Sequence, residues 1–156
     1  MPINNNWFQQ IHKGRHALGM KVKEILYHKR SEYQDILVFE NEDFGTVLVL
    51  DDCYMLSDLD EHMYHKSLTQ YGMQNINPNL NNLNVLVIGA GDGGIVRDLI
   101  RTWGDRIIEL TMVEIDKEVI EVSKQVFPKV ASEFNNPKLD LRVEDALAFI
   151  QSVPAA

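Results

Sequence analysis

The chain has a single cysteine, Cys53, and no hydrophobic run of membrane-spanning length. One cysteine cannot form an internal disulfide, and the first residues lack the basic and apolar regions of a secretory signal. Basic residues are also few: 15 lysines and arginines against 23 acidic residues give a net charge of −8. This balance argues against general binding to nucleic acid or an anionic membrane and suits a cationic ligand. We therefore expect a cytoplasmic protein.

The first part of the chain, residues 1–72, predicts a small antiparallel β-domain. Short runs with β-type alternation occupy residues 20–27, 35–40 and 46–50, and the polar loop between the last two predicts a hairpin. An acidic helix is expected next, with Ser57 as its N-cap and Gly72 as its stop. The asparagine-rich residues 73–83 then predict a linker.

The second part, residues 84–156, alternates strands and helices. Strands are expected at 84–88, 108–114 and 139–143, each followed by a helix, at about 94–103, 116–126 and 145–151. Strand–helix units in series predict an α/β fold with a parallel sheet. No further strand remains to cover the outer side of strand 84–88, so we expect an open apolar edge and a truncated domain. Alternatively, the N-terminal sheet or a partner subunit covers that edge.

The stretch from Val85 to Ile100 joins a buried strand to a helix through a glycine cluster. Glycines there allow a ligand to approach the main chain, which indicates a nucleotide-like ligand. Glu114 ends the next strand, twenty residues past Gly94, where a carboxylate can accept hydrogen bonds from both ribose hydroxyls. NAD is the main rival ligand. Asp92 in the loop argues against it, because a carboxylate repels a pyrophosphate and attracts a sulfonium or an amine.

Six segments, in order, resemble those of the polyamine aminopropyltransferases, the spermidine synthase family. They are Tyr33-Gln34-Asp35, residues 44–51, Asp60-Glu61 with Tyr64-His65, the loop at 89–94, residues 113–116, and Glu144-Asp145. The resemblance covers essentially the whole chain. It implies a small N-terminal antiparallel β-domain followed by a truncated Rossmann-like, methyltransferase-type sheet with helices.

The resemblance also implies transfer of an aminopropyl group from decarboxylated S-adenosylmethionine to putrescine or another polyamine. The donor would be a co-substrate, with no permanently bound cofactor, and the protein a homo-oligomer, dimeric or tetrameric. The amine would contact Tyr64, His65 and Asp92. The residues carried over as nucleoside-binding are Gln34, Gly89, Gly91, Asp92, Glu114 for the ribose and Asp145 for the adenine amino group. No metal is expected, because the acidic helix face lacks a further ligand cluster.

Two departures from the family pattern leave the polyamine substrate open: Asp52 and Met55 stand where the family has glycine and glutamine. The family's catalytic aspartate follows the fourth strand of the α/β domain, beyond Ala156, so we expect poor nucleoside binding and little or no turnover from the chain as given. Two other functions stay open. One is an S-adenosylmethionine-dependent methyltransferase, which shares the glycine loop and Glu114 but needs no acidic helix. The other is a non-catalytic binding or oligomerisation module.

Overall fold

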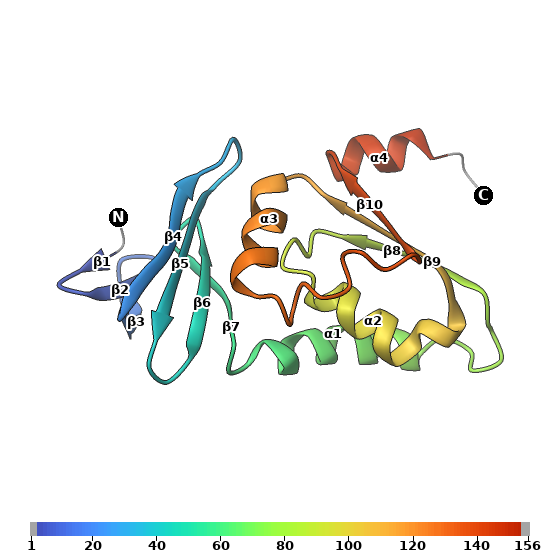
Figure 1. Cartoon of the computed structure of the whole chain (residues 1–156), viewed down its shortest axis with the longest axis horizontal. Helices are drawn as coiled ribbons and strands as arrows, with labels where there is room; N and C mark the ends of the chain where they lie inside the picture. The colour runs from blue at the N-terminus through green and yellow to red at the C-terminus, as the bar shows by residue number, and fades with distance from the viewer. Residues whose placement is uncertain (1–2, 154–156) are drawn as a thin grey trace. The chain divides into compact units, whose positions relative to one another are not determined.

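The structure is a computed structural model of the chain and describes residues 3–153 (Figure 1). It divides into two compact units, residues 1–61 and 62–156. Helix α1 (Glu61–Gln74) therefore groups almost entirely with the second unit, whereas the sequence analysis grouped it with the N-terminal sheet. Among the described residues, no helix is long and apolar enough to cross a membrane.

The first unit is antiparallel, as the sequence predicted, but it contains two small sheets where one was expected. One has the order β1-β2-β3, and the other has the order β4-β5-β6-β7. The strands are β1 (Ile3–Asn4), β2 (Trp7–His12), β3 (His16–Lys21), β4 (Glu24–Arg30), β5 (Asp35–Asn41), β6 (Gly45–Leu50) and β7 (Cys53–Ser57). The predicted hairpin is confirmed, since β5 and β6 pair with Val38 opposite Leu48.

The first unit differs from expectation in several details, beginning with β1, β2 and β7, which the sequence analysis did not predict. The run expected at 20–27 is split between β3 and β4, because the amide of Val22 bonds to Asn6 while that of Lys23 bonds to Glu40 on β5. Ser57 does not cap a helix; it ends β7, and its hydroxyl donates to Asp60 at 2.8 Å. Strand pairing thus overrides the capping preference of serine.

The core of the first unit is aromatic and aliphatic. Phe8 and Phe39 are fully buried, and their rings lie 5.6 Å apart between centroids. The core also includes Met20, Val22, Leu37, Val47 and Val49. Alternate residues of β5 and β6 contribute to this core, which explains the period of two in the sequence.

The second unit has the predicted parallel sheet, with the strand order β10-β9-β8. Its strands are β8 (Leu83–Ile88), β9 (Ile107–Glu114) and β10 (Leu139–Val143). Its other helices are α2 (Gly94–Trp103), α3 (Lys117–Val126) and α4 (Ala146–Ser152), with a short 3-10 turn at Gly104–Arg106. Val85 lies opposite Leu110, and Leu141 lies opposite Met112.

A local signal explains where α3 begins, whereas packing against the core explains where α1 ends. Asp116 caps α3, as predicted, by accepting a hydrogen bond from the amide of Glu118 at 3.0 Å. Gly72 does not stop α1, which continues to Gln74 because the side chain of Met73 is buried in the core of this unit. Burial of an apolar side chain outweighs the low helix propensity of one glycine.

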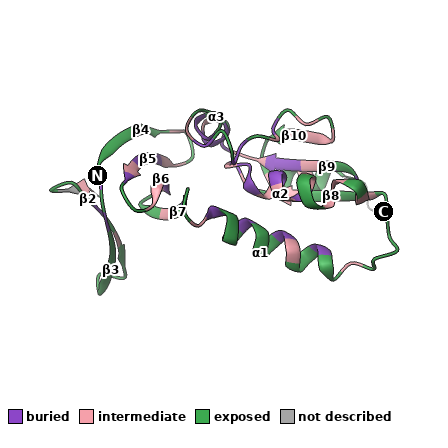
Figure 2. Cartoon of the chain, turned by 60° about the horizontal axis from the view of Figure 1, so that its bottom comes forward, coloured by how far each residue is buried: buried purple, intermediate pink, exposed green. Residues whose placement is uncertain are grey.

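Strand β8 has the exposed edge that the sequence predicted. Within residues 3–153 it pairs with β9 alone. The side chains of Leu86 and Ile88 are 46% and 56% exposed, whereas four of the eight residues of the middle strand β9 are buried. Figure 2 shows buried parts of β9 in purple.

Candidate functional site

The glycine loop connects β8 to α2 at the carboxyl end of the parallel sheet. Gly89 and Gly93 have φ angles of 77° and 87°, which glycine adopts without the penalty that other residues pay. The loop is closed by hydrogen bonds from the Gly93 amide to the Ala90 carbonyl at 2.8 Å and from the Gly89 amide to the Val113 carbonyl at 2.9 Å. In open parallel sheets this edge is where ligands bind.

Glu114 lies beneath this loop, with both carboxylate oxygens hydrogen-bonded to main chain. Oε2 accepts from the amide of Gly91 at 3.1 Å and Oε1 accepts from that of Asp116 at 2.9 Å. A Cβ on Gly91 would lie 2.9 Å from Val119 Cγ1, so only glycine allows this approach. Burial raises the pKa of Glu114, and the amide hydrogen bonds only partly offset the effect. Each oxygen retains a lone pair that a ribose hydroxyl can use.

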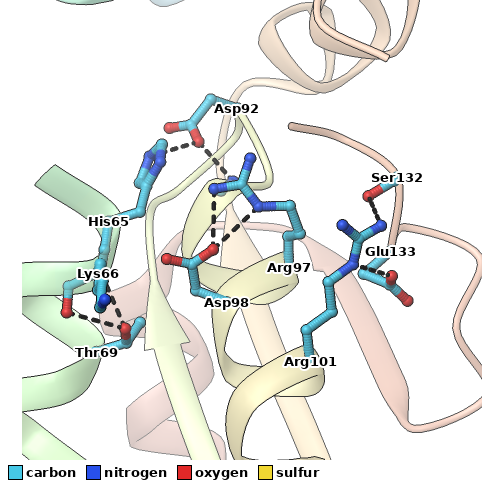
Figure 3. A network of polar contacts seen from close by, with 10 residues as sticks. His65, Lys66, Thr69, Asp92, Arg97, Asp98, Arg101, Ser132 and Glu133 are labelled. Carbon is cyan, nitrogen blue, oxygen red and sulfur yellow. Dashed lines mark hydrogen bonds and ion pairs between the residues drawn. The ribbon is translucent and has the colours of Figure 1, made fainter. Parts of the chain in front are cut away.

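Asp92 extends from the loop toward α1, where it contacts His65 (Figure 3). Its Oδ1 atom lies 3.0 Å from Nε2 of His65 and accepts a hydrogen bond from the amide of Gly94 at 2.7 Å. His65 is fully buried. A Cβ on Gly94 would overlap the imidazole ring, so glycine at this position makes room for the histidine.

The charge of Asp92 follows from these contacts. Burial alone would raise its pKa, but the hydrogen bond and charge of His65, together with the Gly94 amide, outweigh burial and hold the pKa below its usual value. Asp92 is therefore ionised at neutral pH, and the loop carries a negative charge close to main-chain amides.

Of the three residues predicted for the amine site, Tyr64 and His65 differ in accessibility. Tyr64 is 56% exposed and contacts the His65 ring edge-on, with 5.3 Å between the ring centroids. The buried His65 instead reaches Asp92. A ligand in this unit can contact Tyr64 directly, whereas the contact to His65 runs through Asp92.

The other predicted residues lie at a strand end and in the first unit. Asp145 caps α4, with Oδ1 accepting from the amide of Ala148 at 2.8 Å. The Glu144 amide donates to the main-chain oxygen of Glu114 at 3.2 Å, which joins the ends of β9 and β10. Gln34 belongs to the first unit, in a turn where its amide donates to Ser31 Oγ at 3.0 Å.

The sequence analysis did not single out Arg97, which lies three residues into α2. It is buried, and its Nε and Nη2 atoms donate to Asp98 Oδ1 at 3.0 and 2.9 Å (Figure 3). The signal in the sequence that could have identified it is the pair of opposite charges, Arg97 and Asp98, soon after the glycine loop. Within residues 3–153 no group of three or more His, Cys, Asp or Glu residues could hold a metal ion.

The two departures from the family pattern lie in and after the turn between β6 and β7. Asp51 and Asp52 have φ angles of 45° and 63°, the positive values of a two-residue hairpin turn. Glycine adopts such angles freely, which explains why it suits the position of Asp52. Met55 is 48% exposed on β7.

Comparison with known proteins matches both units. Residues 61–156 match the family model of the spermine/spermidine synthase domain, and residues 6–58 match that of the spermidine synthase tetramerisation domain. A polyamine aminopropyltransferase from Clostridium perfringens is 41% identical over 147 residues, covering 94% of this chain and 50% of the relative.

Solved structures show the same similarity. A spermidine synthase from Thermotoga maritima has a TM-score of 0.86 and 30% identity, covering 97% of this chain and 52% of the other. A spermidine synthase in complex with the transition state analogue AdoDATO has the same TM-score and identity, covering 97% and 51%. The chain thus spans about half the length of its relatives. With more than half of its residues matched by the synthase domain, the chain belongs to the spermine/spermidine synthase family.

Proposed function

We propose that this chain supplies nucleoside-binding and amine-facing residues for the transfer of an aminopropyl group from decarboxylated S-adenosylmethionine to putrescine. The observation that carries the proposal is the ionised Asp92 in the glycine loop, held by His65 and the Gly94 amide. A negative charge at this place attracts a sulfonium or an ammonium group and repels a pyrophosphate. Family membership and a relative solved with AdoDATO support the same ligand class.

The proposed reaction needs positioning more than covalent help. The neutral amine nitrogen of putrescine attacks the carbon beside the sulfonium sulfur, a C–N bond forms, the C–S bond breaks, and methylthioadenosine leaves. The acceptor loses one proton overall. The donor is already activated by its positive charge, so the protein gains rate by alignment and by a field of the correct sign.

We assign the residues of the second unit as follows. Glu114 holds the ribose hydroxyls, Gly89 and Gly91 let the nucleoside approach the main chain, and Asp145 contacts the adenine amino group. Tyr64 lines the amine site, and His65 acts by holding Asp92 in place.

Outside this unit, Gln34 is proposed to contact the nucleoside side of the site. Little or no turnover by this chain alone stays a prediction. The match of residues 6–58 to a tetramerisation domain supports a homo-oligomer assembled through the first unit.

The alternative enzyme, an S-adenosylmethionine-dependent methyltransferase, would use the same loop and Glu114. It would need no affinity for a diamine, so the amine separates the two proposals. A pure oligomerisation module would bind neither nucleoside nor amine.

Titration calorimetry tests these proposals with methylthioadenosine, putrescine, S-adenosylmethionine and NAD. We expect the chain to bind the first two in preference to NAD. Asp92→Asn should weaken putrescine binding at least about tenfold, the loss of one close charge contact. Asp105→Asn, at an exposed acid in the turn after α2, is the matched control and should change nothing. Preferential binding of NAD, or equal putrescine affinity in both variants, would contradict the proposal.

A further inference from the structure

The turn that joins β4 to β5 carries Gln34 and consists of residues 31–34. It closes between Arg30 and Asp35, which lie opposite each other in the antiparallel pair. The amide of Ser31 donates to the carbonyl of Gln34 at 2.8 Å, so the main chain turns back on itself within four residues. Serine is favoured in such turns because its hydroxyl can bond to main-chain groups a few residues along.

The side chain of Ser31 uses its full hydrogen-bonding capacity inside this turn. Its Oγ atom accepts from the amide of Tyr33 at 3.1 Å and from the amide of Gln34 at 3.0 Å. The same hydroxyl donates to the carbonyl of Gln34 at 3.2 Å. A hydroxyl has one proton and two lone pairs, so all three are engaged. Both main-chain polar groups of Gln34 are therefore bonded to Ser31.

The residue after Gln34 is held from a second turn. The amide of Asp35 donates to Oδ1 of Asp51 at 2.9 Å, and the amide of Asp51 donates to the carbonyl of Asp35 at 2.9 Å. Asp51 lies in the turn between β6 and β7 and has a φ angle of 45°. Ser31 thus holds Gln34 on one side and Asp51 holds its neighbour on the other, with every one of these bonds inside the first unit.

The hairpin does not need this concentration of bonds in order to form. Six residue pairs join β4 to β5, and the buried side chains of β5 fix the strands in place. Glu32 and Tyr33 in the turn are exposed, so water is available there to main-chain groups. Ordering an exposed turn costs conformational entropy, and here the order is directed at the main chain of Gln34.

We propose that Ser31 is a positioning residue for nucleoside binding and acts through Gln34. By bonding both main-chain groups of Gln34 it fixes the backbone angles, and these angles restrict the rotamers of the side chain. The glutamine amide offers two donors and an acceptor, which suit the hydroxyls and ring nitrogens of an adenosine-type ligand. Ordering the main chain in advance lowers the entropy cost of binding. The inference rests on the proposed function, from which it takes the nucleoside contact of Gln34.

The test is NMR titration of the chain with methylthioadenosine, together with amide hydrogen exchange. We expect Ser31→Ala to weaken binding about three- to tenfold. The amides of Tyr33 and Gln34 should exchange at least about tenfold faster in this variant, because both lose their acceptor. Ser31→Thr keeps the hydroxyl and should bind within about twofold of the wild type. Unchanged exchange of the β5 amides would show that the first unit stays folded.

A double-mutant cycle separates positioning from a purely structural role. In a Gln34→Ala background, Ser31→Ala should cause no further loss of affinity, because the side chain that Ser31 directs is gone. Ser152→Ala is the matched control. Ser152 is an exposed serine whose hydroxyl also donates to a main-chain carbonyl, that of Phe149 at 2.7 Å, and its loss should change neither measurement.

The outcomes distinguish this inference from the proposed function. Equal affinity of the wild type and Ser31→Ala would overturn the inference, as would a further loss of affinity in the Gln34→Ala background. The proposed function would then stand, provided that the wild type binds methylthioadenosine and Gln34→Ala weakens the binding. If Gln34→Ala binds as tightly as the wild type, the nucleoside contact of Gln34 is wrong and the inference fails with it. A wild-type chain that does not bind methylthioadenosine would overturn both.

Discussion

Replacing Gly94 by alanine tests the contact between α1 and the glycine loop. The new Cβ would overlap the ring of His65, which has no exposed surface and hence no free space to rotate into. Gly94 is the first residue of α2 and does not have a positive φ angle, so the backbone itself tolerates alanine. Whether Gly94→Ala raises or lowers the free energy of unfolding therefore depends on the cost of its clash with the His65 ring.

The magnitude follows from two opposing contributions. Alanine in place of glycine in a helix is worth about 0.5–1 kcal/mol of stability. Against this, overpacking costs about 1–3 kcal/mol, and if the ring moves instead, the contact between His65 and Asp92 is lost at a similar cost. We expect Gly94→Ala to lower the free energy of unfolding by about 1–2 kcal/mol.

Gly72→Ala is the matched control, because Gly72 also lies in a helix and its Cβ would meet nothing within 4 Å. It should raise the free energy of unfolding by about 0.5–1 kcal/mol. Urea titration followed by far-ultraviolet circular dichroism measures both, since the α-helices lie almost entirely in the second unit.

A double-mutant cycle then isolates the contact. In a His65→Ala background, Gly94→Ala should become neutral or stabilising, because the ring that it would overlap is gone. If Gly94→Ala is as stabilising as Gly72→Ala, or if removal of the histidine leaves its cost unchanged, the close approach of His65 to the loop is refuted.

Three further predictions concern carboxylates. The pKa of Asp92 in the folded protein is held below its ordinary value of 3.8. The ionised carboxylate therefore stabilises the folded state above pH 3.8, and this contribution is lost as the pH falls through the lower pKa of the folded protein. In Asp92→Asn the free energy of unfolding should depend less steeply on pH in this acidic range. The pKa of Glu114 is raised above 4.5, so the folded state gains stability as pH falls through the raised value. Glu114→Gln should abolish that gain and weaken methylthioadenosine binding at least about tenfold, whereas Glu121→Gln, on the surface, should do neither. Tyr54, whose pKa is raised to about 12, donates to Asp60 at 2.7 Å; Tyr54→Phe should lower the free energy of unfolding by about 1–2 kcal/mol, and an unchanged urea midpoint would contradict this.

The parts of the fold that were predicted correctly depend on short-range signals. The hairpin at 35–50 follows from two alternating runs and a polar loop, and the cap at Asp116 follows from one carboxylate before an amphipathic stretch. The sequence also predicted Glu114 at the end of β9, because consecutive parallel strands place their carboxyl ends at one edge of the sheet, whereas its hydrogen bond from the Gly91 amide came from the structure.

The errors arose where distant contacts outweighed local preference. Ser57 has the chemistry of an N-cap but pairs with Val47 as the last residue of β7. Gly72 has the chemistry of a helix stop, yet burial of Met73 carries α1 past it. In both cases the deciding partner lies too far along the chain for a local pattern to include it.

The sequence by itself determined the order of the elements in the second unit, the apolar outer edge of β8 and the family resemblance, because periodicity, glycine spacing and acid placement are properties of neighbouring residues. Only the tertiary structure decided that His65 is buried against Gly94 and bonded to Asp92, and that α1 groups with the parallel sheet. These depend on segments almost thirty residues apart being brought into contact, and the accumulated packing of many side chains, rather than any one motif, determines that contact.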